Sequence, residues 1–391
     1  MHTTLAVIAS LVGVTAIALT TASAVQTFVV PRGTPMLLTR WVLLAVRAVF
    51  IVSMRRLRDY RARDRVMAMF APTGLMALPV AWMLLILIGF VPLYWALGGG
   101  SWKSAILTSG SGLLTLGFHT PANWWAGALS IIEAALGLGL LALLISYLPS
   151  IYNCYSRREQ LVTALEVEAG SPPWAPDLLI RLIEIRGLRL LGTYWCDWMH
   201  WFNDIEETHS TTPILVYFRS PAPERCWVTA AGTVLDSAAL VLSAVDVEEP
   251  QPDAELCIRS GYLALRRIGD YFVMPYDADP SPDAPIAVTR EEFDEACRRL
   301  ADAGATLKAD RDQAWQDFAG WRVTYEGTLL RFASLCMAPP APWSSDRPIH
   351  FNRLPVTRRH ARARLRPHRG KPPGGRTKRA VHDEPRQHPD Y

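Results

Sequence analysis

Residues 98–121 read GGGSWKSAILTSGSGLLTLGFHTP and separate two long apolar stretches. The three glycines at 98–100 predict a break in the chain, because glycine readily adopts backbone conformations that end helices. Ser101 is a suitable N-cap for a short, largely apolar helix over residues 102–107. From residue 108 onward the chain is rich in threonine and glycine, yet it remains apolar. A simple loop between two helices would be short and polar, so this stretch is not of that kind.

The flanking sequence predicts membrane-spanning helices. A helix needs about 20 apolar residues to cross the hydrocarbon core of a bilayer, and residues 4–30, 66–97 and 124–148 each meet that length. Trp124 and Trp125 stand at one end of the third stretch, as is typical of residues at a membrane interface. Half of the 391 residues are hydrophobic. We therefore expect an all-α membrane protein.

The placement of arginine predicts the orientation, since cytoplasmic loops of membrane proteins are rich in lysine and arginine. One basic residue, Lys103, separates the second apolar stretch from the third, and Arg157 and Arg158 follow the third. The loop between the first and second stretches carries a run of arginines: Arg32, Arg40, Arg47, Arg55, Arg56, Arg58, Arg61, Arg63 and Arg65. We expect this loop and the region after residue 155 to be cytoplasmic. The protein would then be a multi-pass protein of the inner (plasma) membrane with its N-terminus outside.

Two assignments near the N-terminus have alternatives. We expect residues 1–35 to form an uncleaved membrane anchor helix. The small residues at 21–24 resemble a signal-peptide cleavage site, but the basic segment that begins a signal peptide is missing. We expect residues 36–65 to form a basic interfacial helix along the inner leaflet. The alternative is a short fourth span, which would return the N-terminus to the cytoplasm.

A short apolar helix followed by a threonine- and glycine-rich strand, placed between two spans, has the form of a re-entrant pore loop. Irregular backbone at membrane depth is tolerated only where protein or water covers it, and a ring of subunits around an aqueous axis would supply that cover. The partial negative charge at the C-terminus of the short helix would favour a cation. We expect a pore module over 66–155, with its re-entrant loop at 101–121 and its inner helix at 124–150. The alternative is an external loop with turn glycines.

The pore module resembles that of the potassium-channel superfamily, in the two-helix form found in bacteria. The residues that carry the resemblance are Thr115, Leu116, Gly117 and Phe118, which stand where the family has its TVGY filter sequence. The resemblance implies that the backbone carbonyls of these four residues replace the hydration shell of a permeant monovalent cation, potassium. It implies a homotetramer in the lipid bilayer and passive conduction, with no cofactor, no metal centre and no enzymatic activity.

The next two residues depart from the family, which has glycine and aspartate where this chain has His119 and Thr120. Histidine lacks the conformational freedom of glycine, and the missing aspartate removes a carboxylate from the pore mouth. A ring of four His119 side chains would titrate near neutral pH, so sensitivity to external pH is a hypothesis. The alternative function is a non-conducting, channel-derived membrane sensor or scaffold with a degenerate filter.

Three residues of the inner helix are candidates for a role in the pore. Glu133 is costly at membrane depth, so it is expected to face an aqueous cavity or the interior of the helix bundle. It would either form a ring of carboxylates near the pore or accept hydrogen bonds behind the filter, for example from Ser109. Gly137 and Gly139 would provide either a gating hinge or close packing through small residues.

Residues 156–340 read as a mostly helical cytoplasmic domain. Thr289 and Glu292 have the spacing of a capping box, and residues 214–218 are the only short candidate strand. The domain has no P-loop, GxGxxG or HExxH motif. The neighbouring residues Glu206, Glu207 and His209 favour helix capping or solvation over metal binding. Apolar residues at helical spacing predict helices over 159–169, 177–201, 223–245, 255–272, 289–303 and 310–336. Six cysteines without CxxC spacing argue against a zinc site.

Residues 341–391 are basic and poor in apolar residues, which predicts a disordered tail. The tail and the arginine-rich loop lie on the side where anionic lipid attracts basic residues. We therefore name anionic lipid as an expected partner. Nucleic acid is not expected, because aromatic residues do not interleave the basic ones.

Overall fold

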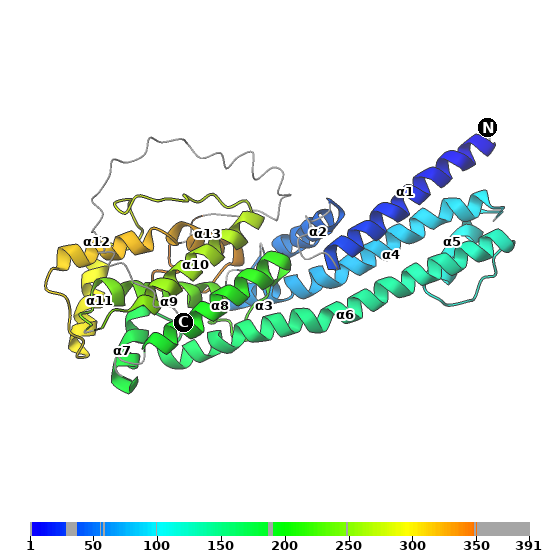
Figure 1. Cartoon of the computed structure of the whole chain (residues 1–391). Coiled ribbons are helices and arrows are strands. Elements are labelled where there is room, and N and C mark those ends of the chain that lie inside the picture. The colour runs from blue at the N-terminus through cyan, green and yellow to red at the C-terminus, as the bar shows by residue number, and fades with distance from the viewer. Residues whose placement is uncertain are drawn as a thin grey trace, which may run out of the picture.

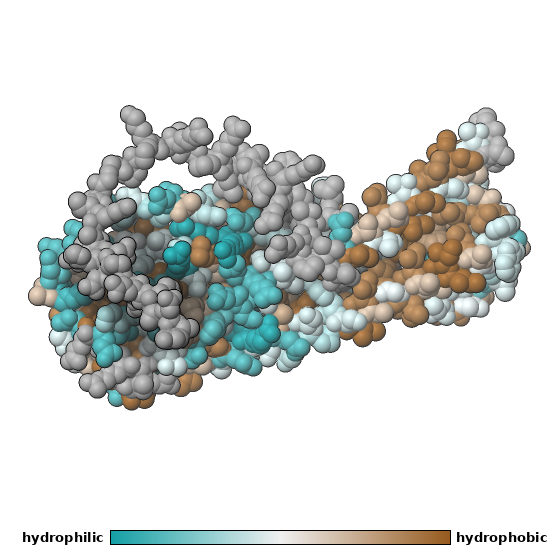
Figure 2. Space-filling model, viewed as in Figure 1, coloured by the Kyte–Doolittle hydropathy of each residue, from teal (hydrophilic) through white to brown (hydrophobic). Residues whose placement is uncertain are grey.

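The chain is described by a computed structural model that covers residues 2–28, 37–54, 56–57, 59–98, 100–186, 191–247, 249–347 and 349. These residues form an elongated, all-helical molecule without β-strands. One end is a bundle of long apolar helices and the other is a cluster of shorter helices (Figure 1). The apolar surface is gathered on the first end and the hydrophilic surface on the second (Figure 2). Residues 350–391, which make up most of the expected tail, lie outside the described part.

Three helices are long and apolar enough to cross a membrane: α1 (His2–Phe28), α4 (Phe70–Ala96) and α6 (Trp124–Ala169). The three predicted spans are therefore confirmed as helices of sufficient length and apolar composition. Helix α1 lies along α4, and the two approach closely at Gly13 and Gly89 (Figure 1). A Cβ on Gly13 would stand 2.3 Å from the carbonyl oxygen of Gly89. Only glycine permits this approach, as in other small-residue helix crossings in membranes.

Helices α2 (Leu37–Met54) and α3 (Tyr60–Ala68) occupy much of the arginine-rich region. Helix α2 packs on α4 and is joined to α1 by a hydrogen bond of 3.1 Å between the hydroxyls of Thr27 and Thr39. It is not among the helices that are apolar enough to span a membrane.

Helix α6 is continuous from the apolar bundle into the cluster of shorter helices. This cluster comprises the described residues from 175 to 347, has a mostly hydrophilic surface, and is called the soluble cluster below. The 46 residues of α6 correspond to a length of about 69 Å, which is more than twice the thickness of a hydrocarbon core. The sequence predicted an inner helix to residue 150 and a second helix from 159. The structure joins them, because Pro149 is accommodated inside the helix and no glycine intervenes before Gly170. Gly170 ends the helix with a φ of +76°.

The soluble cluster contains seven α-helices: α7 (Ala175–Arg186), α8 (Leu191–Thr211), α9 (Trp227–Ser243), α10 (Pro252–Tyr271), α11 (Arg290–Asp302), α12 (Arg311–Arg322) and α13 (Glu326–Cys336). Helix α9 is buried along almost its whole length and is the centre of the core. The capping box of Thr289 and Glu292 is confirmed at the start of α11. Two sequence predictions were too long, since residues 177–201 and 310–336 each form two helices.

The strand predicted at 214–218 is wrong. This segment is a 3₁₀ helix, η2 (Pro213–Tyr217). Proline at its first position favours the start of a helical turn, and the described residues offer no strand with which it could pair. The apolar run is explained by burial, because Leu215 and Val216 are both almost fully covered.

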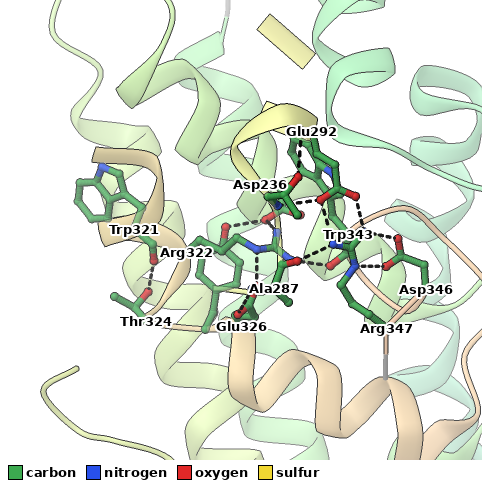
Figure 3. A network of polar contacts seen from close by, with 12 residues as sticks. Asp236, Ala287, Glu292, Trp321, Arg322, Thr324, Glu326, Trp343, Asp346 and Arg347 are labelled. Atoms are coloured by element: carbon green, nitrogen blue, oxygen red, sulfur yellow. Dashed lines mark hydrogen bonds and ion pairs between the residues drawn. The ribbon is translucent and has the colours of Figure 1, made fainter. Parts of the chain in front are cut away.

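A buried ion network holds the soluble helices together (Figure 3). Arg322 has no exposed surface, and its guanidinium donates to Asp236 of α9, to Glu326 at 2.7 Å and to the carbonyl of Trp343 at 2.5 Å. Burial opposes the charged form, but the adjacent Asp236 and Glu326 raise the pKa of Arg322 above its usual value. Because Trp343 is bound in this way, residues 341–347 are packed against the domain. The predicted disordered tail therefore begins too early at residue 341.

A second buried arginine joins α6 to the soluble cluster. Arg158 donates to Glu159 at 2.7 Å and to the carbonyls of Leu215 and Phe218 at 2.9 and 2.8 Å. It also lies 3.2 Å from Nε2 of His209, which must accept the bond. Burial and the neighbouring Arg158 charge lower the pKa of His209 well below its usual value. The histidine is therefore neutral, and the second half of α6 is fixed to α8 and to the segment that follows it.

Candidate functional site

The stretch between α4 and α6 contains a short helix, α5 (Trp102–Leu113), and then an irregular loop. The predicted N-cap is confirmed, since Ser101 Oγ accepts from the amide of Ser104 at 3.2 Å. The helix runs six residues past the predicted end at 107. Helix α5 packs against both α4 and α6 at the end of the bundle farthest from the shorter helices (Figure 1). The sequence underestimated its length because residues 108–113 combine threonine, serine and glycine, which have weak helix propensities.

Close packing places the C-terminal half of α5 against α6. A Cβ on Gly112 would stand 2.8 Å from Ser130 Oγ, and one on Gly137 would stand 2.2 Å from the carbonyl oxygen of Leu113. A Cβ on Gly139 would meet nothing within 4 Å. The two inner-helix glycines are therefore different, because Gly137 is required for contact with α5 and Gly139 lies in open space.

Glu133 joins three helices from a fully buried position. Its side chain has no exposed surface. Ser109 of α5 donates to one carboxylate oxygen at 2.5 Å, and the hydroxyl of Tyr94 of α4 donates to the other at 2.8 Å. Within one chain the carboxylate thus accepts hydrogen bonds behind the loop, which is the second of the two arrangements considered for it. Tyr94 was not anticipated, although it is one of the few polar residues in its apolar helix.

Backbone amides fasten the loop after α5 to Ser111. The amide of Thr115 donates to the carbonyl of Gly112 at 3.0 Å, and the amide of Leu116 donates to the carbonyl of Ser111 at 2.9 Å. The amide of His119 donates to Ser111 Oγ at 3.1 Å. The loop therefore directs its amide groups toward α5.

The backbone of residues 115–118 alternates in handedness. Thr115 has a φ of +55° and Gly117 a φ of +68°, whereas Leu116 and Phe118 do not have positive φ. Such alternation gathers amide N–H groups on one side of the chain and carbonyls on the other. Among the described residues, no hydrogen bond reaches the carbonyl oxygens of these four positions. Thr115 is β-branched, so its left-handed conformation is strained and typical of a functional segment.

The side chain of His119 is bound to α5. Its Nδ1 lies 3.0 Å from Thr108 Oγ1, and that hydroxyl donates its own proton to the carbonyl of Ser104 at 2.9 Å. Nδ1 must therefore carry the hydrogen of the bond. The neighbouring Thr120 is exposed.

The side chains of the loop leave an apolar surface on the single chain. Leu116 is 61% exposed and Phe118 is 60% exposed. Both lie beside the unpaired carbonyl groups. Lipid does not suit the free carbonyls, because it offers them no hydrogen-bond donor.

Two of the three neighbouring residues noted near the end of α8, Glu206 and His209, have partners on other helices. Glu206 is paired with Arg267 at 2.6 Å, whereas His209 is buried against Arg158. Across the described residues no group of three or more metal-ligating side chains is found.

Comparison with known proteins gives no relative for this chain. No protein-family model matches it, and neither does any curated protein or solved structure. The geometry of α5, its loop and Glu133 is therefore the basis for any assignment of function.

Proposed function

We propose that the chain is the pore-forming subunit of a potassium-like cation channel, with Thr115, Leu116, Gly117 and Phe118 as its selectivity filter. The observation that carries the proposal is the loop after α5, whose amides are bonded to the short helix and whose carbonyls are unpaired. A row of free carbonyl oxygens is a ligand set for a dehydrated monovalent cation.

Four copies of the chain are needed to complete this site. One loop supplies carbonyls on one side only, and a free carbonyl in an apolar medium costs several kcal/mol. Fourfold symmetry around an axis would surround the cation with oxygens and cover Leu116 and Phe118. The mechanism is passive conduction, in which the cation exchanges water for carbonyl oxygens and no covalent step occurs.

The remaining site residues have supporting roles in this proposal. Glu133 positions α5 by holding Ser109 and Tyr94 at 2.5 and 2.8 Å, and Gly137 admits α5 against α6. His119 and Thr120 lie at the outer mouth, where protonation of His119 adds a positive charge and lowers cation entry. An unchanged response to external pH in a His119→Ala channel would remove this role for the histidine.

The proposed orientation places the soluble helices in the cytoplasm and the loop after α5 on the outside of the plasma membrane. The arginines of α3, namely Arg61, Arg63 and Arg65, would then lie near the inner leaflet, where anionic lipid attracts them. Because α6 continues from the membrane into the soluble cluster, movement of that cluster would act directly on the inner helix.

The test is planar-bilayer recording of the purified protein in potassium and in sodium solutions, with its oligomeric state measured in detergent by native mass spectrometry. We expect a tetramer and unitary currents. Gly117→Val should abolish the currents. The φ of Gly117 is +68°, and a β-branched residue adopts such a positive φ only with strain. The control is Gly127→Val, the same substitution at a glycine of α6 where an added Cβ would meet nothing within 4 Å. A tetramer without currents in either solution would favour the non-conducting scaffold instead, and a monomer would contradict both.

A further inference from the structure

A cavity at the membrane-distal end of the soluble cluster is lined by aromatic and acidic side chains. It has a volume of about 310 Å³. Its lining consists of Trp174, Glu291, Glu292, Glu295, Pro342, Trp343 and Asp346. The three glutamates come from the first half of α11, and the last three residues belong to the segment packed by Arg322. Four carboxylates and two indole rings form the lining, and no lysine or arginine is part of it. This combination suits a cation with a flat, polarisable group.

Arginine side chains already use the edges of this cavity. Arg347 donates to both oxygens of Glu292, at 2.9 and 2.6 Å, and to Asp346 at 2.8 Å (Figure 3). The guanidinium of Arg299 lies 4.7 Å from the centre of the Trp174 ring. Both modes, paired hydrogen bonds to carboxylate and stacking on an indole, are those that guanidinium forms better than ammonium.

Glu291 and Glu295 supply charge that these two arginines do not bind. They are one helical turn apart on α11, so they lie on the same face. Glu295 forms an exposed pair with Arg298, and such exposed pairs exchange readily with other partners. Arg347 itself is fully engaged by Glu292 and Asp346. The carboxylates of Glu291 and Glu295 on this face of α11 can therefore bind further guanidinium groups.

The chain itself carries the matching charge directly after the cavity. Residues 358–379 contain ten basic side chains and no acidic one. Arg358 follows Arg347 by eleven residues, which span at most about 40 Å when extended. A segment that starts at the wall of the cavity can thus return to it.

We propose that the acidic, tryptophan-lined cavity beside α11 is a docking site for the arginine-rich segment 358–369 of this chain. Guanidinium groups of the segment pair with Glu291 and Glu295 and contact Trp174 at the wall of the cavity. Docking holds the basic segment at the end of the domain farthest from the apolar helices (Figure 1). The proposal does not depend on ion conduction.

The experiment measures binding of a fluorescently labelled peptide of residues 356–371 to the purified chain in detergent, by fluorescence anisotropy. The chain is used in full length and also with a stop after Ile349. We expect the shortened chain to bind the peptide more tightly than the full-length chain, in which the native segment competes. Binding should weaken as salt is raised from 0.05 to 0.3 M, because partly exposed charges are screened.

Matched variants of the shortened chain locate the site. The double variant Glu291→Gln/Glu295→Gln should lower affinity about tenfold, as the loss of two partly exposed ion pairs predicts. It leaves Glu292 and the capping box intact. The control Glu255→Gln/Asp302→Asn removes two exposed carboxylates elsewhere on the domain and should leave affinity unchanged. Replacing the arginines of the peptide with lysine should weaken binding.

Two results would overturn the proposal. One is equal loss of affinity in the two double variants, which would show that the peptide responds only to overall charge, or no loss in either, which would show that Glu291 and Glu295 do not bind it. The other is failure of the peptide to bind the shortened chain while it binds phosphatidylglycerol vesicles. That result would assign the segment to the membrane surface.

Discussion

The two ends of the molecule bury ionisable side chains in different ways. In the apolar bundle, Glu133 is surrounded by neutral hydroxyls, from Ser109 and Tyr94. In the soluble cluster, Arg322 is surrounded by the carboxylates of Asp236 and Glu326. The first arrangement joins helices through hydrogen bonds to neutral groups. The second depends on ion pairs, in which the positive charge of Arg322 is balanced by the neighbouring carboxylates. Removing one partner should therefore be more costly in the soluble cluster than in the bundle.

The largest effect is expected from Arg322→Leu. This change leaves Asp236 and Glu326 buried without their counter-ion, and breaking a buried pair costs about 3–5 kcal/mol. Thermal unfolding in detergent, followed by tryptophan fluorescence, should show a large fall in stability of the soluble cluster. The control Arg298→Gln removes an exposed pair with Glu295 and should cost no more than about 1 kcal/mol. Similar losses in both variants would contradict the role of the buried network.

A smaller effect is expected from Glu133→Leu, which removes the carboxylate that accepts from the hydroxyl of Tyr94. Ser109 loses the same acceptor but retains the carbonyl of Leu87 at 3.2 Å. A buried group left unsatisfied costs about 1–3 kcal/mol. Glu133→Gln keeps one acceptor oxygen and should be milder. The measurement is the temperature at which the oligomer dissociates in detergent. If leucine and glutamine behave alike, the hydrogen bonds of the carboxylate do not hold α5 in place.

Alanine substitutions at Gly137 and Gly139 of α6 should change stability in opposite directions. Gly137→Ala forces a Cβ to within 2.2 Å of the backbone of Leu113, and such overpacking costs about 1–3 kcal/mol. Gly139→Ala meets nothing within 4 Å and should stabilise the helix by up to about 1 kcal/mol. The same unfolding temperatures measure both. A gating hinge at Gly139 would be indicated if its alanine variant conducted differently at unchanged stability.

The smallest effect is expected from Glu292→Gln, and it should depend on pH. The contact with Arg347 is the main cause that lowers the pKa of Glu292 below its usual 4.5. A lowered carboxyl pKa contributes stability above the pKa of the unfolded state, and this contribution is lost as the pH falls through the folded value. The variant should therefore be less stable by about 1 kcal/mol near pH 7. Unfolding midpoints of the two proteins should converge as the pH is lowered below 4.5, and a constant difference would contradict this assignment.

The sequence predicted the helical elements well where local patterns decide them. Apolar length located α1, α4 and α6, Ser101 marked the start of α5, and Thr289 with Glu292 marked the start of α11. Predictions failed where neighbours distant in sequence decide the outcome. The apolar run at 214–218 forms a 3₁₀ helix because it packs against other helices and has no partner strand among the described residues. Composition predicted a disordered tail from residue 341, but the bond between Trp343 and Arg322 packs residues 341–347 against the domain.

The candidate site shows the same division. The residue types of the loop at 115–118 and the unusual presence of Glu133 in an apolar helix can be read from the chain. The alternating handedness of the loop accompanies hydrogen bonds of its amides to Gly112 and Ser111. The partner hydroxyl of Tyr94 comes from a different helix, 39 residues away. No spacing rule links these positions.

Sequence alone determined that three helices can cross a membrane, that a break and a short helix lie between the last two, and that a basic segment follows a charged domain. Those properties depend on hydrophobicity and backbone freedom, which each residue carries by itself. Only the tertiary structure decided that Gly137 is needed for contact while Gly139 is not, that Glu133 is bonded behind the loop, and that α6 is one continuous helix. Each of these depends on the distance between atoms brought together by packing, which local sequence does not specify.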